Sequence, residues 1–182
     1  MFGRLQTSPA REHPELLAPP VAAALAGPWG AEVLVAEIDP ALADTAAFCD
    51  RYDVALDVSA NCVVVAGRRG GETRLAACVV LATTRADVNG VVRRRLDARK
   101  ASFAPMDMAV EQTGMEQGGI TPFGLPAGWP LLVDAAVAAA PWVIVGSGVR
   151  RSKLAVPGAL LGTLPGAEVV EGLASPAPLS PS

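Results

Sequence analysis

The chain has 182 residues, 51% of them hydrophobic, and a formal net charge of -3 at pH 7. Roughly 150 residues is typical of one domain, so the length predicts a single domain with enough apolar side chains to fold alone. The most apolar stretch, residues 131–145, contains Asp134 and Pro141 and is shorter than the roughly 20 apolar residues that cross a membrane. Charged residues also occupy the place of a signal-peptide core near the start, so we expect a cytoplasmic protein without membrane contact.

The few histidine and cysteine residues exclude further classes of protein. His13 is the only histidine, and it lies in a proline-containing stretch that is a poor scaffold for a Ser-His-Asp or Cys-His mechanism. Cys49, Cys62 and Cys78 are too far apart for a CxxC metal or redox motif, and buried free thiols are the simpler interpretation. We therefore expect neither a metal site nor a cofactor.

Local patterns predict short strands mixed with short helices. In chain order, we expect a helix over 20–26, a strand over 31–38, a helix over 39–52, a β-hairpin with strands 61–66 and 75–82, a helix over 86–98, a strand over 100–103, a helix from 105 that ends before Gly114, a strand over 131–133, a short helix capped by Asp134, strands over 142–145 and 153–156, and a helix from 157. Asp39 and Asp87 are the expected N-caps of their helices. The hairpin strands are apolar enough for the centre of a sheet. This succession predicts a mixed-sheet α/β fold.

The two ends of the chain have the composition of tails. Residues 1–17 are polar and contain proline, and residues 173–182 are rich in proline and serine. Such segments contribute little apolar surface to a core. We expect a flexible leader over 1–17, a domain over 18–172 and a flexible tail over 173–182.

The loop from Gly118 to Gly124 is the most informative segment, and it reads Gly-Gly-Ile-Thr-Pro-Phe-Gly. Its glycines permit close approach of the main chain to a ligand, while Pro122 fixes its own φ and restricts Thr121 to extended conformations. Successive N–H groups in such a loop can hold an anion, a carboxylate or a developing oxyanion. An ordinary tight turn is the alternative interpretation.

A second glycine-rich turn, Gly146-Ser147-Gly148, follows a predicted buried strand. Neither this turn nor the 118–124 loop matches the GxGxxG or GxxxxGK[ST] phosphate-binding patterns. Ser147 has no nearby histidine to act as its base, so it is either a hydrogen-bond donor to a ligand or a structural turn residue.

Basic residues form three clusters although the chain as a whole is acidic. The clusters are Arg68, Arg69 and Arg74; Arg93, Arg94, Arg95, Arg99 and Lys100; and Arg150, Arg151 and Lys153. They form either a local positive face that meets phosphates or a solvated charged surface.

Several of these segments, in this order and spacing, resemble the YbaK/EbsC family of aminoacyl-tRNA deacylases. They are Leu81-Ala-Thr83, Asp87-Val-Asn89, Arg99-Lys100-Ala-Ser-Phe-Ala104, Thr113-Gly114, Gly118 to Gly124 and Val145-Gly-Ser-Gly148. The resemblance runs from about residue 40 to residue 172, and relatives include the editing insertion of bacterial prolyl-tRNA synthetases. It implies a single compact α/β domain with a mixed, barrel-like sheet flanked by short helices, a pocket for the aminoacyl group on the 3′ end of a mischarged tRNA, and no metal.

The resemblance also implies which residues form the site. Many relatives carry a lysine, in a Phe-Lys context, where this chain has Ala60-Asn61, so Asn61 is expected in a catalytic place without the lysine's charge. The resemblance implies a carbonyl-positioning role for the backbone of Gly119. The remaining substrate-binding candidates are Lys100, Gly118, Ile120, Thr121, Pro122, Gly124, Gly146, Ser147 and Gly148.

Two functions follow from these expectations. The first is a deacylase that acts in trans on a mischarged tRNA. Its expected partner is aminoacyl-tRNA, with an aminoacyl-tRNA synthetase as a further candidate, and no binding to DNA is expected. The second is a non-hydrolytic binding module of the same fold for aminoacyl-tRNA, an amino-acid-like ligand or a partner protein, as the replacement at Asn61 permits.

Overall fold

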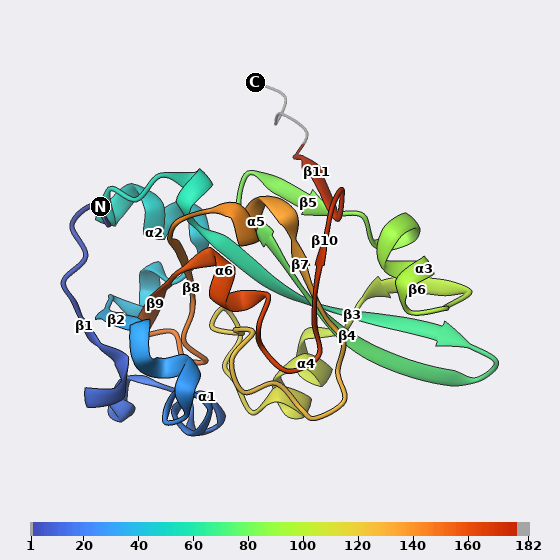
Figure 1. Ribbon diagram of the computed structural model, residues 1–182, viewed down its shortest axis with the longest axis horizontal. Helices are drawn as coiled ribbons and strands as arrows, with labels where there is room; N and C mark the ends of the chain where they lie inside the picture. Colours follow the sequence, from blue (N-terminus) through green and yellow to red (C-terminus); the bar gives the residue numbers. More distant parts are fainter. Residues whose placement is uncertain (1, 178–182) are drawn as a thin grey trace.

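Two β-sheets meet edge to edge in the computed structural model, which describes residues 2–177 (Figure 1). The larger sheet has the strand order β10 (Ala167–Val170), β7 (Leu131–Asp134), β4 (Glu72–Leu81), β3 (Ala60–Arg69) and β6 (Lys100–Phe103). Strands β3 and β4 form a long antiparallel hairpin, and β7 pairs in parallel with both β4 and β10. The sheet is therefore mixed, as the sequence predicts, with the apolar hairpin strands inside it.

The smaller sheet is entirely antiparallel. Its strand order is β1 (Thr7–Pro9), β2 (Leu34–Glu37), β9 (Ser152–Val156) and β8 (Val143–Gly146). A single parallel bridge between Ser59 and Ile144 brings the start of β3 beside β8. The mixed α/β fold is confirmed, and over the described chain the two sheets do not form a closed barrel. Within residues 2–177 this bridge is the one β-pairing between the two sheets, and their other edge strands do not pair with each other.

Short helices cover both sheets. They are α1 (Pro19–Leu25), α2 (Thr45–Tyr52), α3 (Arg93–Arg95), α4 (Met106–Thr113), α5 (Ala135–Ala139) and α6 (Gly158–Leu161). The main core lies between the two sheets and α1, and it includes Leu25, Leu131 and Leu154. A separate apolar cluster packs α2 onto β8 and β9 through Phe48, which is fully buried against Ile144. This second cluster fixes the position of α2 beside the start of β3.

Two predicted helices are interrupted in the structure. The expected helix over 39–52 begins as the 3-10 turn η4 (Pro40–Leu42), capped by Asp39 as predicted, and then breaks at Asp44, whose backbone is extended. The expected helix over 86–98 consists of the π-helical turn η6 (Val88–Val92) followed by α3, and Asp87 accepts hydrogen bonds at its start. In both cases the sequence predicts the N-cap residue, but it does not predict the interruption of the helix.

The chain ends contribute strands to the domain. Residues 7–9, within the expected leader, form β1 on the edge of the smaller sheet, and Ala10 and Leu17 are buried. Near the other end, Leu173 is buried and β11 (Ala174–Pro176) pairs with β5 (Thr84–Ala86). The remainder of the expected tail, residues 178–182, lies outside the described residues. No helix within residues 2–177 is long and apolar enough to cross a membrane.

Candidate functional site

A cavity of about 220 Å³ opens where the two sheets meet beneath the start of α2. Its wall combines residues from α2 and the segment before it, from β3, from the start of α4, from the 118–124 loop and from the β8–β9 pair. The lining residues are Ala43, Asp44, Thr45, Ala60, Asn61, Cys62, Val63, Met106, Gly118, Ile120, Gly146 and Lys153. The cavity thus collects four of the residues predicted from the sequence, namely Asn61, Gly118, Ile120 and Gly146.

The two glycine-rich loops predicted from the sequence lie against each other. The Gly148 N–H donates to the Gly119 carbonyl at 2.7 Å, and the Glu116 N–H donates to the Gly148 carbonyl at 2.8 Å. A Cβ atom on Gly146 would lie 2.5 Å from the Gly119 oxygen, so only glycine permits this approach. The contact between the loops builds one continuous wall of the cavity.

The N–H groups of the 118–124 loop are not equally available to a ligand. The Gly119 N–H donates to the Glu116 carbonyl at 2.9 Å, which occupies the donor that the sequence analysis placed in catalysis. The N–H groups of Gly118 and Ile120 donate to no acceptor within residues 2–177, and both residues line the cavity. Among the loop residues that line the cavity, Gly118 and Ile120 therefore have N–H groups without an acceptor in the described chain.

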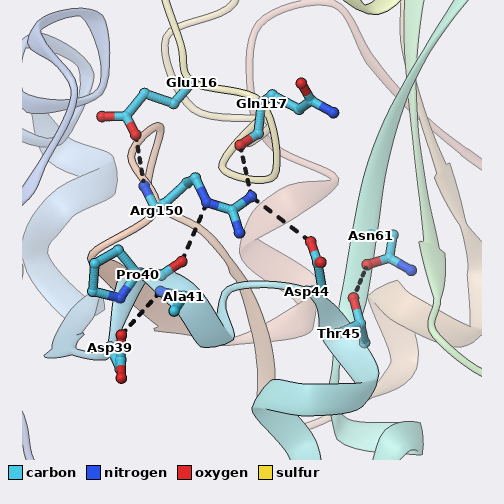
Figure 2. Close-up of polar contacts among 9 residues, drawn as sticks. All are labelled: Asp39, Pro40, Ala41, Asp44, Thr45, Asn61, Glu116, Gln117 and Arg150. Atoms are coloured by element: carbon cyan, nitrogen blue, oxygen red, sulfur yellow. Dashed lines mark hydrogen bonds and ion pairs between the residues drawn. The ribbon is translucent and has the colours of Figure 1, made fainter.

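Arg150 holds this loop against the segment before α2 (Figure 2). Its Nε donates to the Pro40 carbonyl at 3.2 Å and its Nη1 to the Gln117 carbonyl at 3.1 Å. The same Nη1 lies 3.7 Å from a carboxylate oxygen of Asp44. A Cβ atom on Gly118 would lie 2.3 Å from that guanidinium nitrogen, and the φ of +82° at Gly118 also favours glycine. Arg150 is therefore a structural clamp that fixes the loop's position.

Asn61 projects from the start of β3 towards α2, where Thr45 orients it (Figure 2). The Thr45 hydroxyl donates to the Asn61 Oδ1 at 2.8 Å. The two N–H donors of the Asn61 amide have no acceptor within residues 2–177, and the residue lines the cavity. A neutral amide thus stands in the place where the resemblance implies a lysine.

Lys153 supplies the cation of this cavity, and the sequence analysis missed it as a site residue. It lies on β9 directly opposite Gly146 and is 9% exposed. Its Nζ sits 5.2 Å from the centroid of the Phe48 ring, and the residue forms no ion pair within residues 2–177. Burial lowers the pKa of Lys153 from its usual value. The sequence predicts that Lys153 begins a strand, but it does not show that the lysine side chain lines a cavity.

Lys100, which the sequence analysis placed at the site, lies elsewhere. It is exposed at the start of β6 and pairs with Arg68 of β3, at the far end of that strand from Asn61. Its side chain lines a separate surface depression with Arg93 and Arg99. The structure therefore does not bring Lys100 to the cavity.

Four further candidates have structural contacts outside the cavity. Pro122 and Gly124 line a different hollow of about 480 Å³ with Trp29. Ser147 is fully buried, and its hydroxyl lies 2.6 Å from that of Ser152, as expected for a structural turn serine. Gly148 packs against α1, where a Cβ atom would lie 2.4 Å from that of Ala18.

Thr121 is fully buried behind the loop rather than in the cavity wall. Its N–H faces the Met115 sulfur at 3.5 Å, and its hydroxyl has no hydrogen-bond partner within the described residues. Thr121 therefore supports the loop from behind.

The histidine and the thiols do not contribute an obvious base or nucleophile to this cavity. His13 lies beside Glu15 at 3.0 Å, away from the cavity-lining residues. Cys49 and Cys78 are buried free thiols, as predicted, and burial raises the pKa of Cys78 to about 12. Cys62 lines the cavity, but burial raises its pKa as well, which keeps the thiol protonated at neutral pH.

Gly118 and Ile120, whose N–H groups have no acceptor within residues 2–177, line one small cavity of a mixed α/β domain together with Asn61 and Lys153. Such an arrangement binds the carbonyl or oxyanion of a small polar ligand. The chain belongs to the aminoacyl-tRNA editing domain family, whose model matches residues 39–163. That segment contains every residue that lines the cavity.

Solved structures show the same fold at low sequence identity. A candidate trans-editing enzyme for prolyl tRNA synthetase is 22% identical, with a TM-score of 0.71 over 85% of this chain and 94% of the other. A hypothetical protein is 20% identical, with a TM-score of 0.71 over 81% of this chain and 94% of the other. No curated protein matches the sequence significantly.

Proposed function

We propose that this protein hydrolyses the ester bond of a mischarged aminoacyl-tRNA, acting in trans. The observation that carries the proposal is the convergence of three kinds of donor on one cavity. These are the Asn61 amide, the N–H groups of Gly118 and Ile120, and the Lys153 ammonium group. Membership of the aminoacyl-tRNA editing domain family supports the substrate class.

The chemistry requires no protein nucleophile, because an aminoacyl ester is already activated. Water adds to the ester carbonyl, the bond to the ribose oxygen breaks, and that oxygen takes a proton to leave a free amino acid and an intact tRNA end. In this scheme the Gly118 and Ile120 N–H groups hold the carbonyl oxygen. The buried charge of Lys153 opposes the negative charge that develops there. Interactions of this kind contribute several kcal/mol when they are aimed at the oxyanion.

The size of the cavity favours a small aminoacyl group. Its volume of about 220 Å³ lies below the roughly 300–1,000 Å³ of cavities that enclose drug-sized ligands. Met106 and Cys62 supply apolar walls beside the polar donors. We therefore place the wrong amino acid, rather than the tRNA body, in this cavity.

A panel of mischarged tRNAs tests this function. The protein is incubated with each aminoacyl-tRNA, including tRNA(Pro) carrying small wrong amino acids, and ester loss is compared with the protein-free rate. We expect ester loss to be faster than the protein-free rate for at least one small wrong amino acid. For the tRNA that carries its correct amino acid, we expect the protein-free rate. Equal rates with and without protein across the whole panel would contradict hydrolysis and leave the non-hydrolytic binding module, which tight binding without turnover would identify.

A further inference from the structure

A second charged region lies at the other end of β3 from the cavity. Arg68, Arg93, Arg99 and Lys100, which we call the hairpin basic surface, line a depression of about 430 Å³ together with Asn89, Ala101 and Ser102. An adjoining depression of about 300 Å³ continues along the hairpin past Arg69. In Figure 1 this region lies at the right, where the β3–β4 hairpin extends beyond β6 and α3. The region is separate from the site described above.

The cations of this surface are placed against one another rather than against acids. Arg68 and Lys100 are directly opposite in the antiparallel pairing of β3 and β6, and the Arg99 N–H donates to the Arg68 carbonyl at 2.9 Å. Like charges directly opposite in a sheet are destabilising. None of the four residues forms an ion pair within residues 2–177, whereas nearby Arg69 pairs with Asp97 at 2.7 Å. The free protein therefore carries an uncompensated local repulsion that a bound polyanion would relieve.

We propose that the hairpin basic surface binds the sugar-phosphate backbone of the tRNA whose 3′ end enters the cavity. This proposal deepens the proposed function and rests on it for the choice of tRNA. Several cations spread over two adjoining depressions suit a chain of phosphates better than a single anion. The exposed Asn89 and Ser102 side chains add hydrogen-bonding groups of the kind that contact phosphate and ribose hydroxyls.

The distance along β3 between the cavity and the hairpin basic surface fits a ligand much longer than a single amino acid or nucleotide. Asn61 and Arg68 lie near opposite ends of one extended strand, which at about 3.3 Å per residue places their backbones about 23 Å apart. A free amino acid or a single nucleotide spans only one of the two regions. A tRNA can occupy both, with its charged end in the cavity and its backbone on the hairpin.

Binding of uncharged tRNA tests the surface without reference to hydrolysis. The variant Arg68→Gln/Arg99→Gln removes two cations from exposed positions and leaves the backbone pairing of β3 and β6 in place. We expect its tRNA affinity to fall by about tenfold or more, and its salt dependence, as the slope of log K against log salt, to fall by about 2. Arg4→Gln/Arg51→Gln is the matched control, because it removes the same charge from two exposed residues, Arg51 in α2 and Arg4 beside the end of that helix.

Hydrolysis of two substrates separates this proposal from the proposed function. The variant should raise KM for full-length aminoacyl-tRNA and leave hydrolysis of an aminoacyl-adenosine, which lacks the tRNA body, at the wild-type rate. Unchanged tRNA affinity and salt slope in the variant would overturn the proposal, as would an equal loss of tRNA affinity in the control. Binding of an acidic peptide is measured in parallel, and a larger loss of affinity for the peptide than for tRNA would also overturn it. If the wild type hydrolyses neither substrate but the variant still loses tRNA binding, the proposed function fails and the surface stands.

Discussion

The Thr45 hydroxyl donates a 2.8 Å hydrogen bond to the Oδ1 of Asn61, across the mouth of the cavity between α2 and β3. This contact fixes which end of the Asn61 amide faces a ligand. It also links the break before α2 to the site, because Thr45 is the first residue of that helix.

Replacing Thr45 by valine keeps the side chain's shape and removes the donor. One hydrogen bond contributes about 1 kcal/mol, so we expect kcat/KM to fall about fivefold as the Asn61 amide loses its fixed orientation. Thr45→Ser is the control, since it retains the hydroxyl and should retain activity. Equal activity in the valine variant and the wild type would show that this contact does not orient Asn61 for catalysis.

Replacing Lys153 by methionine separates activity from stability. Loss of the buried ammonium group should lower kcat by about 10²–10³-fold, as for other oxyanion-stabilising groups. The free energy of unfolding should stay the same or rise, because the wild type pays to bury a charge that forms no ion pair in the described chain. Urea unfolding and the deacylation assay measure the two effects. The exposed Arg51→Met change is the control, and full activity in Lys153→Met would remove this residue from the mechanism.

The lowered pKa of Lys153 gives a pH dependence whose sign can be worked out. In the unfolded chain the group titrates near its usual 10.5, and in the folded protein it titrates lower because burial disfavours the charge. Between these two values the unfolded state binds more protons, so stability should rise with pH there relative to Lys153→Met. The enzyme-catalysed rate should fall over the same interval as the ammonium group loses its proton. Unfolding and deacylation measured from pH 7 to 10.5 on both proteins test this.

Gly146→Ala tests the contact between the two glycine-rich loops. The new methyl group would lie 2.5 Å from the Gly119 oxygen and 2.8 Å from the Ile120 oxygen, so the loop must shift. We expect the free energy of unfolding to fall by about 1–3 kcal/mol, as for other overpacked sites, and hydrolysis to fall with it. Gly27→Ala is the control, because its methyl group would meet only Ala24 at an ordinary 3.5 Å. Wild-type thermal unfolding of Gly146→Ala would contradict this account.

Asn61→Lys introduces the lysine that many YbaK/EbsC relatives carry at this position. Because Lys153 already lines the same small cavity, the change places two ammonium groups near each other. Their repulsion should lower stability and impair hydrolysis in an active parent. The double change Asn61→Lys/Lys153→Met should recover part of the activity, since it moves one cation rather than adding a second. A gain of hydrolysis in the single variant of an inactive parent would instead favour a binding module derived from an enzyme.

Local sequence patterns determined much of the framework. The hairpin of β3 and β4, the strand at Lys100–Phe103 and the caps at Asp39, Asp87 and Asp134 follow from alternation and side-chain chemistry within a few residues. These features were legible because each depends on neighbours in the chain.

Tertiary structure alone decided which cation serves the cavity. Lys100 and Lys153 both sit in basic clusters, but strand pairing sends Lys100 to the exposed end of β3 and sets Lys153 opposite Gly146 in the buried β8–β9 pair. The Gly119 N–H donates within the local 116–119 turn, which the sequence analysis did not predict, and Gly118 and Ile120 are the cavity-lining loop residues whose N–H groups have no acceptor in the described chain. The local sequence predicts the Gly118–Gly124 loop as a candidate ligand wall, and two of its residues, Gly118 and Ile120, line the cavity. The charge that faces them depends on the register between distant strands, which no local pattern encodes.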